Sequence, residues 1–301
     1  MAPLFSAYII VDWSAAARPV TGANSIWIGV RRRDAQSFES FNPATRLKAR
    51  NLLHDLAREF VSRGQRVLIG FDFALGYPAG TARALGLDAH HLSPWKAMHA
   101  HLASQIVEHE DNKNDRFKLA ATLNERMTGG AHPFWGAPRS QTCATLAARK
   151  GNFDRSESLP EHRLTEGWVR STFKAHPKSV WQLLGAGAVG SQSLLGIAAV
   201  AELRARIAGA QLWPFETGPG KMTAQRLEHT SCLMAEIYPS TANVTENPEE
   251  FLDQAQVRTL SDRFESLDSA GILGGAFDFT NSISDREIHK IIDEEGWILA
   301  K

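Results

Sequence analysis

Residues 7–14 read Ala7-Tyr8-Ile9-Ile10-Val11-Asp12-Trp13-Ser14 and combine a short apolar, β-branched run with one acidic residue near its end. This composition is typical of a buried strand, so the carboxylate that ends it must lie at the sheet edge or be paired. Residues 25–30 again have strand composition, and Pro19 and Gly22 favour turns between the two runs. We therefore expect a long hairpin that places Asp12 beside a polar loop.

A second apolar run has the same arrangement. Residues 65–73 read Gln65-Arg66-Val67-Leu68-Ile69-Gly70-Phe71-Asp72-Phe73 and again end by presenting an acid, Asp72. Between the two runs, residues 38–41 predict a short edge strand, and residues 43–63 have apolar positions at helical spacing. If the two acid-bearing strands are parallel neighbours, both carboxylates emerge at the same carboxyl-terminal edge of the sheet.

The composition limits the classes of function. The chain has 301 residues, of which 43% are hydrophobic, which is enough for a packed core. Because 33 basic residues balance 33 acidic ones, no global field attracts nucleic acid or an anionic membrane, and any polyanion site must be local. Two cysteines without metal-binding spacing, no signal peptide and no apolar run of about 20 residues predict a reduced, cytoplasmic setting.

The middle of the chain, approximately residues 77–230, predicts a large and mostly helical insertion. Within it, residues 129–138 are rich in turn formers and hold Trp135. Two readings of this segment stay open: its aromatic side chains pin a loop to the core, or Trp135 forms a wall of the active site.

The segment Gly185-Ala186-Gly187-Ala188-Val189-Gly190 matches the dinucleotide-binding glycine pattern. That motif needs a preceding strand and an acid about 20 residues later, where this chain has arginines, so we reject it. We expect instead a tight turn into a helix over residues 193–207, whose free N–H groups could hold an anion. Four polar residues near these turns are candidate substrate contacts, with helix capping as the open alternative: Ser14, Lys178, Ser191 and Gln192.

The sheet is expected to resume at residues 232–240, where Glu236 precedes a proline, and two helices follow over residues 250–256 and 262–273. Asp268 lies in the second of these helices among small and apolar residues. Carboxylates gathered at one end of a sheet repel each other and need a cation or a shared proton. Mg²⁺ or Mn²⁺ suits such oxygen ligands, and two ions about 4 Å apart can activate water and stabilise the leaving oxygen of a phosphodiester.

Four short segments, in this order along the chain, resemble a bacterial family of predicted ribonuclease H-like nucleases, a domain family of unknown function. They are Val11-Asp12-Trp13-Ser14, Gly70-Phe71-Asp72-Phe73, Glu236-Ile237-Tyr238-Pro239 and Leu267-Asp268-Ser269-Ala270. The resemblance implies an α/β fold, with a ribonuclease H-like mixed sheet flanked by helices, as a single domain over residues 1–301. It also implies a metal-dependent nuclease whose catalytic and metal-binding candidates are Asp12, Asp72, Glu236 and Asp268.

Two departures from that pattern keep other functions open. The resemblance implies a second acid close to Asp268 on the late helix, but none lies between Ser269 and Gly275. The neutral overall charge also does not suit non-specific binding to long nucleic acid. A small phosphorylated substrate is therefore an alternative to nucleic acid. The remaining alternatives are an actin-like phosphotransferase or ATPase, and a non-catalytic nucleotide- or cofactor-binding protein. The sequence does not indicate the oligomeric state.

Overall fold

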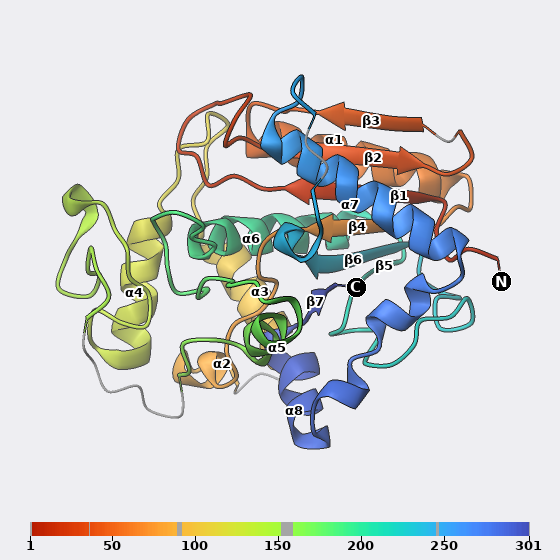
Figure 1. Cartoon of the computed structure of the whole chain (residues 1–301). Helices are drawn as coiled ribbons and strands as arrows, with labels where there is room; N and C mark the ends of the chain where they lie inside the picture. Colours follow the sequence, from red (N-terminus) through yellow and green to blue (C-terminus); the bar gives the residue numbers. More distant parts are fainter. Residues whose placement is uncertain (1, 36, 89–91, 152–158, 245–246, 301) are drawn as a thin grey trace.

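A mixed seven-stranded sheet forms the centre of the molecule (Figure 1), in a computed structural model that describes residues 2–35, 37–88, 92–151, 159–244 and 247–300. The strand order is β3-β2-β1-β4-β6-β5, and β7 also pairs with β6. The strands are β1 (Ala7–Asp12), β2 (Trp27–Arg32), β3 (Ser37–Phe41), β4 (Val67–Phe71), β5 (Ala210–Leu212), β6 (Cys232–Ile237) and β7 (Ile298–Leu299). The chain is therefore α/β, as the sequence predicted.

Strand β1 is central and fixes the direction of its neighbours. It pairs antiparallel with β2, which confirms the expected hairpin, and parallel with β4. Strand β6 continues the parallel arrangement beside β4. The arrowheads of β1, β4 and β6 accordingly point to the same side of the molecule, on the left in Figure 1. The carboxyl ends of three buried strands therefore meet at one sheet edge.

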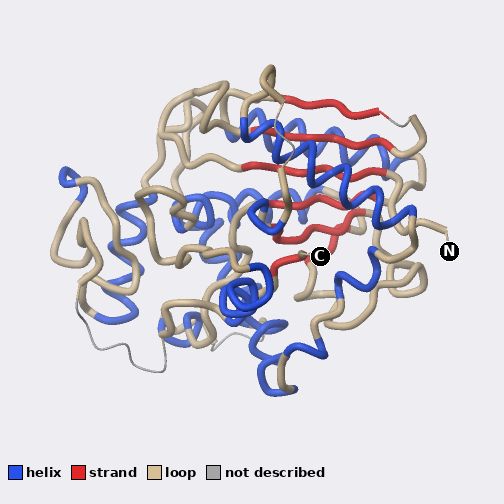
Figure 2. The backbone as a smooth tube through the Cα atoms, in the orientation of Figure 1, coloured by secondary structure: helices blue, strands red, loops and turns tan. Residues whose placement is uncertain are grey.

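Helices cover both faces of the sheet, and Figure 2 shows the strands as one layer between them. α1 (Arg46–Ser62) and α6 (Gly190–Arg206) lie on one face, and α7 (Leu252–Ser269) lies on the other. The other α-helices are α2 (Thr81–Ala84), α3 (Pro94–Gln105), α4 (Arg116–Thr128), α5 (Leu164–Phe173) and α8 (Asp285–Lys290), and short 3-10 and π-helical turns lie between several of the helices. Alternate residues of β1 contact different helices, as the two-residue period of a strand requires. Ile9 and Val11 pack in a cluster with α1 and α6, whereas Tyr8 and Ile10 pack in a cluster with α7.

Between residues 77 and 230, the described part of the chain contains five α-helices. It also contains β5, which pairs with β6. Part of this stretch therefore belongs to the sheet, and the description of residues 1–301 as one domain with a helical insertion stays a prediction.

A third apolar cluster joins α3, α4 and α6, and Trp135 packs against it. Trp135 also donates its backbone N–H to Trp181 O at 3.0 Å. Of the two interpretations of residues 129–138, this packing fits the one in which aromatic side chains pin the loop to the core.

The end of the chain differs from the expectation. Residues 252–269 form one continuous helix, α7, where the sequence suggested two. No proline or glycine interrupts these residues, and the buried side chains of Val257, Leu260 and Phe264 follow a single helical face. α7 begins near the carboxyl end of β1, where Asn24 N–H donates to Asp253 at 2.7 Å. It ends near the start of β1.

Asp268 consequently lies at the wrong end of the sheet for the predicted site. Its carboxylate accepts hydrogen bonds from the backbone N–H groups of Leu4 and Phe5 at 2.9 Å, and from the Tyr8 hydroxyl at 2.6 Å. Fifteen residues of helix separate it from Asp253, which is about 22 Å. The expectation that Asp268 joins the other acids is therefore wrong, because its apolar surroundings mark a buried anchor for the N-terminal segment.

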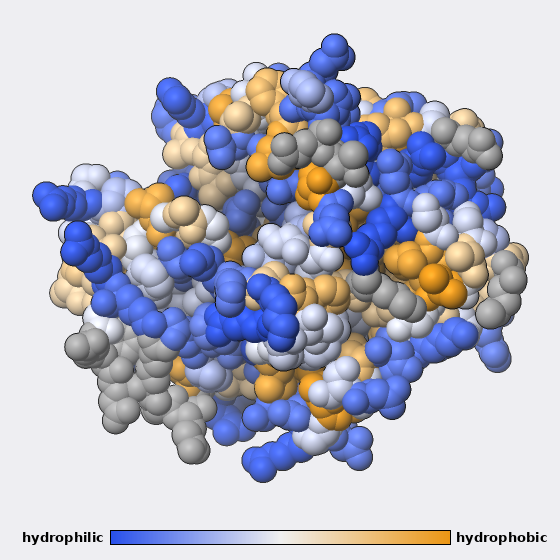
Figure 3. All heavy atoms as spheres, in the orientation of Figure 1, coloured by the Kyte–Doolittle hydropathy of each residue, from blue (hydrophilic) through white to orange (hydrophobic). Residues whose placement is uncertain are grey.

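The described residues contain no helix suited to cross a membrane. Among the described residues, no helix combines the length and the apolar composition that a bilayer span requires. Figure 3 shows polar residues spread over one face of the molecule, with the apolar ones in separate small groups.

We expect Asp268→Ala to lower the free energy of unfolding by about 3 kcal/mol, since it leaves three donors without their charged acceptor. Urea denaturation measures the change. Asp55→Ala, on the exposed side of α1, is the matched control and should change stability by less than about 0.5 kcal/mol. A similar loss in both variants would contradict the anchoring role.

Candidate functional site

Asp12 and Asp72 lie side by side at the carboxyl ends of β1 and β4. Strand β1 ends at Asp12, and Asp72 directly follows β4, so their backbones are fixed by the sheet. Asp72 N–H donates to Val11 O at 3.2 Å, and Asp72 Oδ1 accepts the backbone N–H of Trp13 at 2.8 Å. The two carboxyl groups also hydrogen-bond to each other. The structure therefore brings together these two of the four predicted acids.

The pair cannot easily carry two negative charges. Burial raises the pKa of Asp12 well above its usual value, and the charges of Asp72 and Asp253 raise it further. Burial also raises the pKa of Asp72 to about 7, against the lowering effect of its bond from Trp13 N–H. A hydrogen bond between two carboxyl groups requires a proton on one of them, so a shared proton is one way to relieve the repulsion.

Asp253 is the acid that sequence reasoning missed. It lies in the first turn of α7 and lines the same cavity as Asp12. Burial raises its pKa, against the bonds donated by Asn24 and Ser25 N–H, and its own charge acts on both Asp12 and Asp72. An acid at the start of the helix after β6 was the signal that could have identified it, because that helix end faces the carboxyl edge of the sheet.

Two cavities adjoin the acid pair. One, of about 510 Å³, is lined by residues that include Asp12, Asp253 and Arg116. The other, of about 310 Å³, is lined by residues that include Asp72 and Glu236. Both share three residues of the wall: Gly185, Ala188 and Gln192.

The glycine-rich segment 185–190 forms this shared wall. Gly185 and Gly187 adopt left-handed φ values of 119° and 69°, which favour glycine. A Cβ on Gly190 would lie only 2.4 Å from Val180 O, so glycine lets the start of α6 approach the preceding turn closely. The glycines thus serve a turn and a close contact.

The predicted polar contacts are placed as follows. Gln192 lines both cavities and donates to the backbone oxygen of Trp13. Ser191 lines the larger cavity and donates to Leu183 O at 2.7 Å, and Lys178 is an exposed residue that lines the smaller one. Trp135 is not among the described residues that line either cavity.

The buried side chain of Arg46 binds the loop that follows β1. Arg46 Nη1 donates to Ser14 O at 2.9 Å and to Ala16 O at 2.8 Å, and its Nε pairs with Glu108. Ser14 lines the larger cavity. The carbonyl groups of Ser14 and Ala16 are therefore turned toward Arg46.

Glu236 lies at the same sheet edge but already has a cation. Arg163 donates to both of its carboxylate oxygens, at 2.6 and 2.8 Å, and Leu75 N–H donates to one of them at 3.1 Å. The same guanidinium also pairs with Glu166, and all three side chains are buried. The predicted metal-ligand role of Glu236 is therefore corrected: Arg163 supplies the positive charge that we assigned to a metal ion.

The donors at the acid pair fit a hard divalent cation. Among the described residues, no group of three or more His, Cys, Asp or Glu side chains could hold a metal ion. Mg²⁺, however, is commonly bound by only one or two carboxylates and takes its remaining oxygen ligands from water and substrate. Asp12 and Asp72 meet that smaller requirement, and the structure gives no support for a second ion.

The raised pKa values predict how stability varies with pH. A carboxyl group with a raised pKa in the folded state keeps its proton after the unfolded chain has lost it, so stability falls as pH rises from about 4 through about 7. Asp12→Asn removes one of the two acids and their repulsion. Between about pH 5 and pH 8, we expect the wild type to lose at least about 1 kcal/mol more than Asp12→Asn. Urea denaturation at both pH values measures this, and parallel pH profiles would contradict it.

The Arg163 pairs predict a large cost for removing the guanidinium. Arg163→Met should lower the free energy of unfolding by about 3–5 kcal/mol, because Glu236 and Glu166 stay buried without their partner. The double variant with Glu236→Gln should be more stable than Arg163→Met alone. A double-mutant cycle of denaturation measurements tests this, and additive losses would contradict the proposed pairing.

No protein-family model, curated protein or solved structure matches this chain. Function is therefore inferred from the chemistry of the site itself.

Proposed function

We propose that the protein is a metal-dependent phosphodiester hydrolase on a ribonuclease H-like fold. The observation that carries the proposal is the hydrogen-bonded Asp12–Asp72 pair at the ends of adjacent parallel strands. Two half-buried acids that repel each other lower the stability of the fold unless a cation or a proton lies between them, so the pair is better explained by a function than by a structural role.

The strand arrangement supports the fold part of the proposal. Three antiparallel strands, β3, β2 and β1, are followed by the parallel neighbours β4 and β6, with a helix between β3 and β4. This is the order of elements that the sequence resemblance implied. The acid of the late helix then corresponds to Asp253 instead of Asp268.

Asp12 and Asp72 would hold the divalent ion, with the charge of Asp253 nearby. When bound, the ion supplies charge stabilisation for a phosphoryl oxygen and makes water more acidic. The chain's own residues position these groups. Trp13 N–H orients Asp72, and Gln192 fixes the backbone of Trp13.

The size of the site favours a small phosphorylated substrate over long nucleic acid. The two cavities measure about 310 and 510 Å³, in the range of small-molecule pockets. The equal numbers of acidic and basic residues point in the same direction. An actin-like phosphotransferase is less well supported, because the carbonyl groups of Ser14 and Ala16 face Arg46 in the loop that would cradle phosphates.

The test combines metal binding with hydrolysis. We expect isothermal titration to detect Mn²⁺ binding to the wild type, and Asp12→Asn to weaken it at least about tenfold by removing a charged ligand. Mn²⁺-dependent cleavage of bis(p-nitrophenyl) phosphate should fall in parallel. Asp55→Asn, which removes an exposed aspartate on α1, is the matched control and should behave as the wild type.

Melting temperatures separate the remaining readings. Mg²⁺ should raise the melting temperature of the wild type more than that of Asp12→Asn, because the ion relieves repulsion only when both acids are present. Equal gains would exclude Asp12 as a ligand and remove the main support for the hydrolase. Metal binding without any hydrolysis would favour a non-catalytic binding protein.

A further inference from the structure

Arg116 is a buried arginine on the wall of the larger cavity. It begins α4 and is 9% exposed. Its Nε donates to Ser191 Oγ at 3.0 Å, and its Nη1 donates to Asn114 Oδ1 at 2.8 Å. Both partners are neutral. Among the described residues, no acceptor contacts its Nη2 atom.

The charge of Arg116 is not balanced by a carboxylate. No acidic side chain of the described residues forms an ion pair with it, whereas Arg46 pairs with Glu108 and Arg163 with two glutamates. Burial, together with the like charge of Arg46, lowers the pKa of Arg116 to about 10. A buried guanidinium normally has an anionic partner, since desolvating an unpaired charge is costly.

The start of α6 lies beside this guanidinium. Ser191, the second residue of α6, is the hydrogen-bond partner of Arg116 Nε. The neighbouring N–H groups of Gly190 and Ser193 donate to Gln182 O and Val189 O. Those of Ser191 and Gln192 have no acceptor within the described residues. Free N–H groups at a helix start and a guanidinium are the two donor types that most often hold phosphate in proteins.

We propose that Arg116 and the start of α6 bind a phosphate group of a small phosphorylated substrate in the larger cavity. Asp12 and Asp253 line the same cavity, so a phosphate held by Arg116 lies in the same cavity as one member of the acid pair, Asp12. The reaction at that phosphate rests on the proposed hydrolase function, but binding of the phosphate does not. Arg116 is therefore a substrate-binding residue that the sequence alone did not single out.

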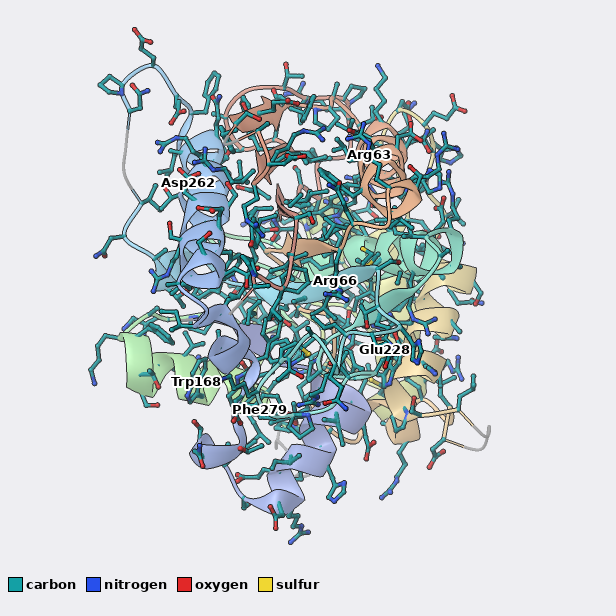
Figure 4. The ribbon with its side chains drawn as sticks, turned by 90° about the vertical axis from the view of Figure 1, so that its right-hand side faces the viewer. Arg63, Arg66, Trp168, Glu228, Asp262 and Phe279 are labelled. Carbon is teal, nitrogen blue, oxygen red and sulfur yellow. The ribbon has the colours of Figure 1, made fainter. Side chains whose placement is uncertain are left out.

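Phosphate binding to the metal-free protein tests the proposal. We expect inorganic phosphate, titrated in EDTA-containing buffer, to raise the melting temperature of the wild type. Arg116→Gln should weaken phosphate binding at least about tenfold, because it removes a charged donor. Arg63→Gln removes one positive charge from the end of α1, on the side of the molecule that Figure 4 presents and away from the acid pair. This matched control should bind phosphate as the wild type does.

Stability without ligand is the second readout. Because Arg116 has no carboxylate partner, Arg116→Gln should melt at the same temperature as the wild type or higher in phosphate-free buffer. A structural arginine would give the opposite result. If Arg116→Gln does not fold, Arg116→Lys, which keeps the charge and loses the planar fork, decides the question: weaker phosphate binding than that of the wild type supports the assignment, and equal binding overturns it.

The outcomes separate this inference from the proposed function. Equal phosphate binding by the wild type and Arg116→Gln overturns the subsite even if Mn²⁺-dependent hydrolysis is found. Phosphate binding that depends on Arg116, without hydrolysis, supports the subsite and contradicts the hydrolase. Stronger protection by a single-stranded oligonucleotide than by adenosine 5′-monophosphate, at equal phosphate concentration, would overturn the small-substrate class.

Discussion

Two half-buried carboxyl groups within a hydrogen bond of each other constrain the rest of the site. The sheet fixes the separation of Asp12 and Asp72, because β1 and β4 are adjacent and parallel. The two carboxyl groups cannot move apart, so their negative charge must be balanced by a proton or by a cation. The neighbouring features follow this constraint: Trp13 N–H stabilises one of the acids, Gln192 holds Trp13, and cavities open on both sides.

The sequence could predict this pair because its causes are local. An apolar β-branched run that ends in an acid specifies both the strand and the position of the carboxylate, and parallel pairing then brings two such ends together. The antiparallel hairpin of β1 and β2 and the edge strand β3 were predicted for the same reason. Each of these features needs only neighbouring residues and the period of a strand.

The other two acids could not be assigned correctly, because their roles depend on partners far along the chain. Glu236 is paired with Arg163, which lies 73 residues away, and no pattern around either residue indicates the other. Asp268 was chosen because it lies among apolar residues, but that signal identifies burial and not location. Asp253 looks like an ordinary acid in the first turn of a helix. Only the direction of α7 across the sheet decides which end of that helix meets the site.

The bonds between Asp268 and the N-terminal segment join residues up to 264 positions apart. During synthesis, β1 emerges from the ribosome before α7 does. Until α7 is made, the side chains of Tyr8 and Ile10 lack the cluster that covers them, and Leu4 and Phe5 lack the acceptor for their N–H groups. A product that stops before residue 252 would therefore expose one apolar face of the sheet. The same helix covers that face and carries Asp253 to the cavity of Asp12, so a truncated product lacks both the cover of the sheet and one acid of the site.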